Sequence, residues 1–487
     1  MRVRVPMVLG IAMMLAAAAL TGLTPATPTT ALAAGPAQKG DGKAAWLGSQ
    51  PDIIVILTDD QRAGTEQAMP FTWSFFRSHG VHYPQAQVPT NLCCPARASF
   101  LTGEYAHTTG VWENNGKNGG FKAFRNWQGQ TLPANLDDVG YETSLFGKYI
   151  NRFNRSGGRY TIPKGWDVFH TYDDEKADGG YWTSIAELPE GYTTDVLGNA
   201  VVQQIQTADP ETPQFIYYSP YAPHAPFDPG PYRHTASREK LLEFREAGGL
   251  TEANEAIREK DVQDKPRWIR VLPRLSPRVL RLTADRSSRT LMGVDANVQR
   301  IIEAQGQYRD LSNTMVVYLT DNGVAWGDHR LRLKRHPYDQ ASRIPLLIKY
   351  PEGTIGAEPP GTSSTRMVNQ LDVTATLAQL GGASPTGEGM SLLGAPRRKL
   401  PLEASPSRGG QLIRPGFCGV RTSRFLYLKY TDGTRELYDY RKDPYELENV
   451  VGSGRYSWRT VRFDSLLDPG CDLAELNAMP ARGGSGD

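Results

Sequence analysis

Two unbroken apolar runs of strand length lie far apart in the chain, and each ends in acidic and amide side chains. Residues 53–57 read Ile-Ile-Val-Ile-Leu and precede Thr58-Asp59-Asp60, while residues 315–319 read Met-Val-Val-Tyr-Leu and precede Thr320-Asp321-Asn322. Apolar runs without alternation are typical of central strands that are covered on both faces. The pattern therefore predicts two buried strands with polar side chains at their carboxyl ends.

Strand and helix patterns alternate along the rest of this region. Further strands are predicted at 142–146, running into Gly147-Lys148, and at 214–218, shortly before His224. Apolar positions at helical spacing across 291–302 predict a helix that leads into the strand at 315–319. Such alternation favours an α/β fold with a mostly parallel sheet, whose ligands bind beyond the carboxyl ends of the strands. This rule places around one cleft Asp59, Asp60, Lys148, His224, Asp321 and Asn322.

The N-terminal residues have the composition of an export signal. Arg2 and Arg4 precede an apolar stretch from Met7 to Leu23, and residues 30–34 contain an Ala-x-Ala cleavage pattern. A membrane anchor is the weaker interpretation, because the stretch is short and contains glycine and threonine. The sequence predicts a signal peptide at 1–33 and a linker at 34–50, and hence a secreted, extracellular protein without stable membrane insertion.

The remaining residues divide into a large and a small predicted domain. A large α/β domain is predicted at 51–383, and within it residues 232–289, rich in Arg, Lys and Glu, predict a solvated, partly helical excursion over the cleft. A smaller C-terminal α+β domain with the tail is predicted at 384–487. Its apolar runs at 425–430 and 436–440, separated by Thr-Asp-Gly-Thr, predict an antiparallel hairpin.

Composition and charge narrow the range of functions. With 487 residues, 39% of them hydrophobic, and 54 basic against 52 acidic residues, the chain has ample material for a folded core. Removal of the predicted signal peptide leaves equal numbers of basic and acidic residues. This balance argues against a dedicated nucleic-acid-binding protein and against electrostatic attachment to membranes.

The segment at 91–103, Asn-Leu-Cys-Cys-Pro-Ala-Arg-Ala-Ser-Phe-Leu-Thr-Gly, is the most informative part of the sequence. Pro95 fits the first position of a helix, because it has no N–H to lose there. Cys93 would then lie at a helix N-terminus, where positive potential lowers the pKa of a thiol and attracts an anion. Arg97 lies one turn further along the same face and can bind an oxyanion through two parallel hydrogen bonds.

This Cys-x-Pro-x-Arg pattern followed by Leu-Thr-Gly resembles the signature of the sulfatase family, the formylglycine-dependent members of the alkaline-phosphatase superfamily. By this resemblance, Cys93 is the residue that a formylglycine-generating maturation enzyme oxidises. The remaining family elements occur in the family order between about residues 51 and 451. Asp59 and Asp60 match the first metal-binding pair, Lys148 the sulfate-contacting lysine, and His224 the central histidine. Asp321 and Asn322 match the second metal-binding pair, and Lys334 the late lysine.

The resemblance implies an alkaline-phosphatase-like fold and a sulfuric ester hydrolase with one Ca²⁺ per chain. Three carboxylates and an amide oxygen in one place call for a cation, because like charges repel. Oxygen ligands favour a hard ion, and Mg²⁺ is less favoured than Ca²⁺ because it retains its waters. The implied metal ligands are Asp59, Asp60, Cys93, Asp321 and Asn322. The implied catalytic residues are Cys93, Arg97, Lys148, His224 and Lys334.

In the mechanism that the resemblance implies, one hydroxyl of hydrated formylglycine attacks sulfur and the alcohol leaves; the second hydroxyl then loses its proton and sulfate is expelled. Nearby cations offset the charge that develops as the S–O bond breaks. Lys334 or His224 would protonate the leaving oxygen, and desolvation beside other cations would lower the pKa of Lys334. Because His224 could instead bind a sulfate oxygen, both assignments stay open.

One position departs from the family pattern. Many sulfatases have a histidine two residues after the lysine matched by Lys148, where this chain has Ile150 and then Asn151. That arrangement, with Cys-Cys-Pro, is similar to the N-acetylglucosamine-6-sulfatase and extracellular heparan-sulfatase branch. The similarity implies a sulfated sugar of the glycosaminoglycan kind as substrate, with aryl sulfate esters also accepted. The base of the elimination step stays open among Asn151, His107 and a water molecule.

Other interpretations of these residues remain. Cys93 and Cys94 could form a structural pair, or one could bridge Cys418 or Cys471, although in an exported protein we expect the last two to pair with each other unless they stay free thiols. Taken singly, the acidic pairs fit a helix cap and a turn. Two rival functions are a phosphonate or phosphodiester hydrolase on the same fold and a catalytically silent relative that binds sulfated glycans.

Overall fold

The computed structural model describes residues 49–153, 161–172, 180–182, 185, 187–251, 253–384, 387–409, 412–467, 469–479 and 482–483. The predicted signal peptide lies outside these residues, as does the predicted linker up to residue 48. Residues 42–487 group into one compact unit, to which all the described residues belong. Within the described part of this unit, no helix combines the length and the apolar character needed to cross a membrane.

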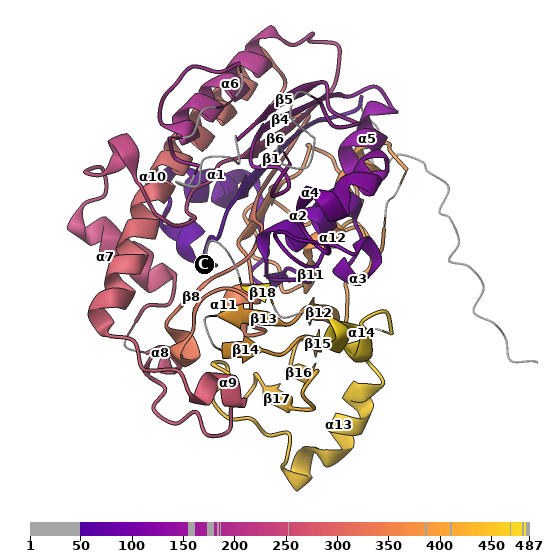
Figure 1. The fold of residues 1–487 in the computed structure, drawn as a ribbon. Coiled ribbons are helices and arrows are strands. Elements are labelled where there is room, and N and C mark those ends of the chain that lie inside the picture. The colour runs from indigo at the N-terminus through magenta and orange to yellow at the C-terminus, as the bar shows by residue number, and fades with distance from the viewer. Residues whose placement is uncertain are drawn as a thin grey trace, which may run out of the picture. The chain divides into compact units, whose positions relative to one another are not determined.

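A seven-stranded sheet lies at the centre of the unit (Figure 1). The strand order is β2-β10-β7-β1-β6-β4-β5, and every neighbouring pair is parallel except those that β10 makes with β7 and β2. This confirms the predicted mixed, mostly parallel sheet and its four predicted strands. The strands are β1 (Asp52–Thr58), β2 (Val81–His82), β4 (Glu142–Gly147), β5 (Val168–Thr171), β6 (Gln214–Ser219), β7 (Thr314–Thr320) and β10 (Leu346–Lys349).

The central strand β1 is buried on both faces. Ile53 lies beside Phe215 of β6 and Met315 of β7. Because side chains alternate along a strand, Ile53 packs into one apolar core and Ile54 into the other. The unbroken apolar run therefore reflects two cores that meet at one strand.

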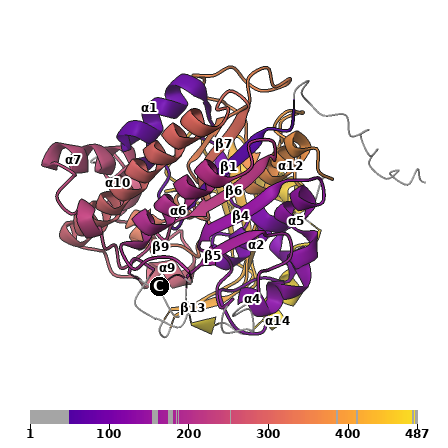
Figure 2. The ribbon, with the colours of Figure 1, turned by 90° about the horizontal axis from the view of Figure 1, so that it is seen from above.

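Helices cover both faces of the sheet (Figure 2). One face packs against α2 (Cys93–Thr102), α5 (Leu132–Asp137) and α12 (Gln370–Gly381). The other packs against α1 (Pro70–His79), α6 (Thr193–Thr207) and α10 (Pro277–Tyr308). Helix α10 is the helix predicted before the second apolar strand; the Ser276 hydroxyl accepts a hydrogen bond from Val279 N at 3.3 Å and caps its N-terminus.

Shorter elements connect these layers. The excursion at 232–289 is partly helical as predicted, with α7 (Arg238–Ala247), α8 (Glu255–Arg258), α9 (Arg267–Arg270) and the start of α10. The other short helices are α3 (Ala106–Thr109), α4 (Gly120–Phe124) and α11 (Asp339–Ser342). Short strand pairs are formed by β3 (Ala86–Gln87) with β11 (Val368–Asn369) and by β8 (Ala325–Trp326) with β9 (Arg332–Leu333).

The C-terminal residues form a second, antiparallel sheet in the order β12-β15-β16-β17. Its strands are β12 (Leu400–Ala404), β15 (Phe417–Arg421), β16 (Phe425–Tyr430) and β17 (Arg435–Asp439), and the last two confirm the predicted hairpin. The remaining elements are β13 (Ser407–Gly409), β14 (Leu412–Arg414), β18 (Arg482–Gly483), α13 (Ser457–Asp464) and α14 (Leu473–Ala478). A disulfide joins Cys418 to Cys471, as expected, while Cys93 and Cys94 are free thiols. The domain boundary at 383/384 stays a prediction.

Candidate functional site

Helix α2 presents Cys93 from its first residue. Leu92 is the N-cap, so Pro95 occupies the third helical position rather than the predicted first one. This correction costs the helix no hydrogen bond, because the N–H groups of the first turn have no partner within a helix. All ten residues of α2 are buried. The side chain at position 93 is therefore fixed inside the protein, at the amino end of a helix.

The thiol of Cys93 lies between acidic and basic groups. Lys334 Nζ is 2.8 Å from Cys93 Sγ, and the nearest carboxylate oxygens of Asp59 and Asp60 are 3.5 and 3.9 Å away. Burial raises the pKa of this thiol and outweighs the nearby lysines, so the predicted lowering is wrong. Because the thiolate is the nucleophilic form of cysteine, the unmodified side chain is poorly suited to attack an ester.

Asp59 and Asp60 follow β1 directly, as the sequence pattern predicts. Asp60 adopts a left-handed backbone with φ of 64°, a conformation that aspartate tolerates better than most residues. Its backbone N–H donates to Asp321 Oδ1 at 3.1 Å, which ties the end of β1 to the end of β7. The two strand ends therefore bring their acidic side chains into one cluster.

Asn322 completes the oxygen-bearing part of the cluster. Its Nδ2 donates to Asp60 Oδ1 at 2.7 Å, and its own Oδ1 is buried with no hydrogen-bond partner among the described residues. An orphaned buried amide oxygen is uncommon and indicates a missing partner such as an ion. The structure thus brings together all the residues predicted as metal ligands, with the Cys93 side chain beside them.

Arg97 binds the acidic cluster from α2. Its Nε donates to Asp321 Oδ2 at 2.8 Å, and its Nη1 donates to Lys148 O at 2.9 Å and to Ser219 Oγ at 2.7 Å. Its Nη2 lies 3.9 Å from Asp59 Oδ2 and is buried without a hydrogen-bond partner among the described residues. One guanidinium N–H group is therefore left to bind an incoming oxygen.

Lys148 and Lys334 supply further positive charge, and His224 lies beside the same carboxylates. Lys148 Nζ donates to Asp59 Oδ2, and Lys334 Nζ donates to both carboxylate oxygens of Asp60, at 2.6 and 2.8 Å. His224 Nε2 lies 3.5 Å from Asp60 Oδ2. Every residue predicted for catalysis consequently contacts the same group of carboxylates.

Mutual neutralisation sets the protonation of the cluster. Burial would raise the pKa of Asp59, but Lys148 and His224 outweigh it and hold that pKa well below its usual range. The pKa of Asp60 is lowered against burial by Lys334 and His224. The pKa of Lys334 is raised in return, although burial alone would lower it. Its predicted lowering is wrong because its nearest neighbour is a carboxylate, not another cation.

A loop at 327–336 carries Lys334 between β8 and α11. Four of its non-glycine residues have positive φ: His329, Arg330, Leu333 and Arg335. Such backbone persists only where the surroundings fix it. Here Arg62 makes paired hydrogen bonds to Asp328 at 2.7 and 3.0 Å, and His329 Nδ1 lies 2.7 Å from Glu259 Oε2. These buried contacts hold the loop, and with it the lysine, in place.

The donor set of the cluster fits a hard divalent cation. Ligand atoms of Asp59, Asp60, Cys93 and His224 all lie within 4.8 Å of one another, and the unpartnered amide oxygen of Asn322 adds a further donor. Carboxylate and amide oxygens are the ligands that calcium takes in proteins. The residues present therefore fit the predicted ion.

Sequence reasoning missed two residues that support the site. Ser219 ends β6, and its Oγ accepts from Arg97 and donates to Leu57 O at 3.1 Å. The ring of Tyr221 lies 5.7 Å from Lys148 Nζ and 4.7 Å from the His224 ring. A polar residue at the carboxyl end of a buried strand was the available signal for Ser219. Nothing in the sequence pattern pointed to Tyr221.

At position 150, where many sulfatases have a histidine, this protein has isoleucine, and no other residue is assigned as the base of the elimination step. Ile150 is buried in the apolar core. Asn151 Oδ1 is buried and has no hydrogen-bond partner among the described residues. His107 is held by Glu403, with its backbone N–H 3.1 Å from Oε1 and its Nδ1 2.7 Å from Oε2. These contacts leave the choice of elimination base open.

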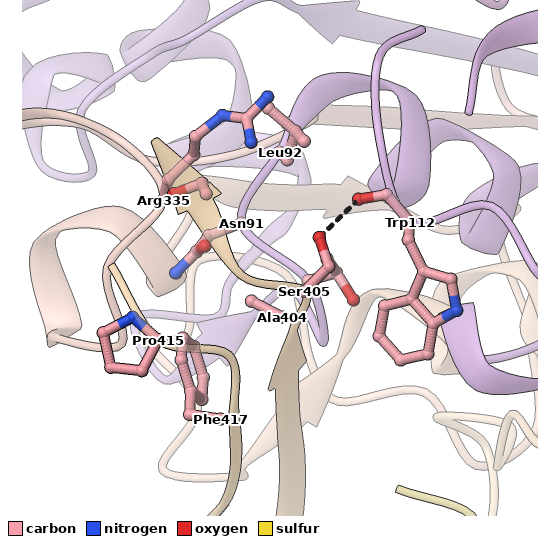
Figure 3. Close-up of a pocket in the computed structure, with 10 residues that line it drawn as sticks. Asn91, Leu92, Trp112, Arg335, Ala404, Ser405, Pro415 and Phe417 are labelled. Carbon is pink, nitrogen blue, oxygen red and sulfur yellow. Dashed lines mark hydrogen bonds between the residues drawn. The ribbon is translucent and has the colours of Figure 1, made fainter. Parts of the chain in front are cut away.

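A small cavity lies beside the N-terminal end of α2 (Figure 3). Asn91, Leu92, Arg335 and Ser405 are among its lining residues, and its volume of about 10 Å³ is the size of one water molecule. Ser405 Oγ also hydrogen-bonds Trp112 O at 3.4 Å across this space. The cavity is too small for a substrate and is lined by none of the residues predicted for catalysis, so we do not assign it to the reaction.

The sequence of this protein is similar to those of known sulfatases. The sulfatase family model matches residues 51–383. The chain is 27% identical to an arylsulfatase of Volvox carteri, over 87% of this chain and 75% of that protein. It is 28% identical to the human N-acetylglucosamine-6-sulfatase, over 71% and 64%. It is 30% identical to the extracellular sulfatase SULF-1 homolog of Drosophila melanogaster, over 74% of this chain but only 32% of that longer protein.

Solved structures share the fold at low identity. One, determined with its substrate D-glucosamine-2-N,6-O-disulfate, aligns with a TM-score of 0.67 at 20% identity, over 88% of this chain and 99% of that one. The phosphonate monoester hydrolase of Agrobacterium radiobacter aligns with a TM-score of 0.58 at 18% identity, over 88% and 95%. These likenesses confirm the predicted alkaline-phosphatase-like fold. The family match across most of the described residues shows more: the chain belongs to the sulfatase family and is a sulfuric ester hydrolase.

Proposed function

We propose that the protein is an exported sulfatase that removes sulfate from a sulfated sugar, using formylglycine at position 93 and one calcium ion. One observation carries the proposal: Cys93 begins a buried helix and its side chain lies among three carboxylates, an unpartnered amide oxygen and three cationic groups. The N-acetylglucosamine-6-sulfatase among the relatives supports a substrate such as N-acetylglucosamine-6-sulfate. The arylsulfatase relatives support aryl sulfates as additional substrates.

The proposed calcium ligands are the oxygen donors gathered at the ends of β1 and β7 and the side chain at position 93. They are Asp59, Asp60, Asp321, Asn322 and residue 93. A bound divalent ion supplies positive charge that polarises a sulfate oxygen and favours deprotonation of a bound hydroxyl. The lowered pKa values of Asp59 and Asp60 support this role, because both side chains are then charged at neutral pH.

The hydrated aldehyde of formylglycine supplies an oxygen nucleophile for sulfur and, after the alcohol has left, a second hydroxyl whose deprotonation releases sulfate and restores the aldehyde. The unmodified thiol lacks this chemistry because it carries no second hydroxyl, and burial also raises its pKa. We therefore propose a formylglycine-generating maturation enzyme as a partner of the chain. Its product at position 93 would lie next to Lys334, whose Nζ contacts the present sulfur.

The chain's own side chains bind the sulfate group and handle its protons. We assign the sulfate oxygens to Lys148 and to Arg97 Nη2, which has no hydrogen-bond partner among the described residues. Preorganised cations of this kind stabilise charge that develops as the S–O bond breaks. Lys334 or His224 donates the proton that the leaving alcohol oxygen requires.

Mass spectrometry of the peptide containing residue 93 tests the modification. Because CHO replaces CH₂SH, we expect a peptide about 18 Da lighter than the cysteine form. Turnover of N-acetylglucosamine-6-sulfate and of 4-nitrophenyl sulfate, compared with a 4-nitrophenyl phosphodiester, tests the substrate class. An intact thiol in protein that still hydrolyses sulfate esters would refute the mechanism. Faster turnover of the phosphodiester would favour the rival hydrolase.

A further inference from the structure

A groove lies apart from the carboxylate cluster, among α7, α8, the start of α10 and the loop at 327–330. Its volume is about 620 Å³, which is within the range of cavities that hold small ligands or a few units of a polymer. In Figure 1 the helices that form it lie along the same edge of the molecule. None of the residues assigned to the reaction lines it.

The charged side chains of the groove are mainly arginines. Its lining contains five arginines and one acid, Glu259. Glu259 is already bound by His329 and Lys265, and Arg245 is paired with Asp285 at 2.6 and 2.8 Å. Within the described residues, Arg274, Arg281 and Arg330 form no ion pair, although Arg274 and Arg330 donate hydrogen bonds to backbone carbonyl groups. The groove therefore has a positive surplus, although the mature chain as a whole is predicted to be neutral.

The walls between these arginines are aliphatic. Leu242, Ile257 and Leu275 line the groove, and Leu242 is about half exposed. At its floor, a Cβ on Gly327 would lie 2.6 Å from the Leu280 side chain, so a larger residue there would disturb the surface. The lining contains no aromatic side chain. A stacking platform for the bases of single-stranded nucleic acid is therefore missing from it.

We propose that this arginine groove binds a sulfated glycan chain. Guanidinium groups match sulfate oxygens with paired, charge-assisted hydrogen bonds, and aliphatic walls suit the C–H faces of sugar rings. This inference rests on the proposed function. The bound glycan would be the part of the polymeric substrate that lies outside the reaction site, or a neighbouring glycan. The concave shape and the unpaired charge favour an anionic polymer of this kind over a flat protein partner.

The groove and the reaction site share one loop. Gly327 and Arg330 line the groove, and Lys334 follows four residues after Arg330. The same loop is anchored by the Arg62–Asp328 pair. A glycan held in the groove therefore contacts the segment that carries a predicted catalytic lysine, which gives the groove a physical connection to the reaction.

Binding of dextran sulfate, with unsulfated dextran as the neutral control, tests the groove without any turnover. The test variant is the double substitution Arg274→Ser/Arg281→Ser. Its matched control, Arg125→Ser/Arg286→Ser, removes the same charge from exposed positions outside the groove. We expect the groove variant to bind dextran sulfate at least about tenfold more weakly, because hydrogen bonds to charged groups are lost. The control should bind within about twofold of the unaltered protein.

The outcomes separate this inference from the proposed function. If dextran sulfate binding is weakened equally in both variants, or not at all in the groove variant, the proposal that the groove binds the glycan is overturned. Arginine-dependent binding of an oligothymidine of equal charge, as tight as that of dextran sulfate, also overturns the glycan assignment. Turnover of 4-nitrophenyl sulfate should persist in the groove variant, which shows that the fold and the reaction site survive. If the unaltered protein hydrolyses no sulfate ester, the proposed function fails while the binding result still decides the groove.

Discussion

Two polar clusters in this protein shift the pKa values of their carboxyl groups in opposite directions. The carboxylate–cation cluster, comprising Asp59, Asp60, Asp321, Arg97, Lys148 and Lys334, lies at the ends of β1 and β7. The tyrosine–glutamate cluster, comprising Glu436, Glu446, Tyr338, Tyr430, Tyr438 and Tyr440, lies at the C-terminal sheet. Both are buried. In the first, the pKa values of Asp59 and Asp60 are lowered; in the second, those of Glu436 and Glu446 are raised.

The neighbours, and not the burial, explain this difference. Burial favours the neutral carboxylic acid in both clusters. In the first cluster, lysine and histidine charges overcome that preference. In the second, Glu436 is surrounded by the hydroxyls of Tyr338, Tyr430 and Tyr438, whose hydrogen bonds do not offset burial. The first cluster therefore favours charged carboxylates, which can bind an ion, whereas the second favours neutral carboxylic acids bound by tyrosine hydroxyls.

The largest expected effect on turnover comes from substitution of Cys93, with its neighbour Cys94 as the control. Cys93→Ser should reduce sulfate-ester turnover by at least about 10⁴-fold, because the proposed nucleophile is lost. Cys94→Ser is the matched control, since Cys94 packs in the apolar core rather than in the carboxylate–cation cluster. Steady-state kinetics with 4-nitrophenyl sulfate measure both. Full activity in Cys93→Ser would rule out this residue as the source of the nucleophile.

A pair of amide substitutions tests the comparison directly. Asp60→Asn should lower turnover by about 10²–10³-fold and abolish the rise in melting temperature that calcium gives, because a charged ligand is lost. Glu436→Gln should leave turnover within about twofold, since Glu436 lies outside the carboxylate–cation cluster and an amide oxygen can still accept from the tyrosine hydroxyls. Thermal melts with and without calcium, and kinetics, measure the pair. Similar loss of activity in both variants would contradict the assignment of charge.

A smaller effect separates the two candidates for the proton donor. Removing a general acid slows poor leaving groups most, by about 10²-fold, and activated leaving groups less. Lys334→Ala and His224→Ala should therefore differ in the ratio of sugar-sulfate to 4-nitrophenyl-sulfate turnover. Tyr338→Phe, in the other cluster, is the control and should leave the ratio unchanged. If neither variant changes the ratio, the proton comes from another group.

The smallest effect concerns stability and pH. Burial and Asp339 raise the pKa of Glu446 from 4.5 to about 7. Between these values the unfolded chain releases the proton and the folded chain keeps it, so stability falls as pH rises through this range. Glu446→Gln should remove a pH-dependent loss of stability on the order of 3 kcal/mol across this range, because each unit of pKa shift corresponds to about 1.4 kcal/mol. Chemical denaturation at several pH values measures this, and an unchanged slope would show that Glu446 is charged in the folded protein.

Much of the site could be predicted because strand ends are visible in the sequence. The runs before Asp59 and Asp321 became β1 and β7, and the parallel sheet brought their ends together as predicted. The motif placed Cys93 and Arg97 on one helix, and the structure confirms both positions. These inferences succeed because local pattern and sheet topology are sufficient to determine them.

The protonation states could not be predicted, because they depend on pairs that the sequence does not show. Cys93 was expected to have a lowered pKa from the helix alone, yet burial dominates. Lys334 was expected beside cations, yet it binds Asp60. The tyrosine–glutamate cluster gave no signal, since its members come from separate elements and each fits an ordinary strand or loop.

The complete burial of α2 also determines when, relative to folding, position 93 can be modified. All ten of its residues are covered, so a modifying enzyme, which has to bind the peptide around position 93, cannot engage this segment once the sheet and its helices have assembled. Any oxidation of this cysteine has to precede the final packing of the chain. On the proposed mechanism, the time between synthesis and folding therefore limits the fraction of molecules that becomes active.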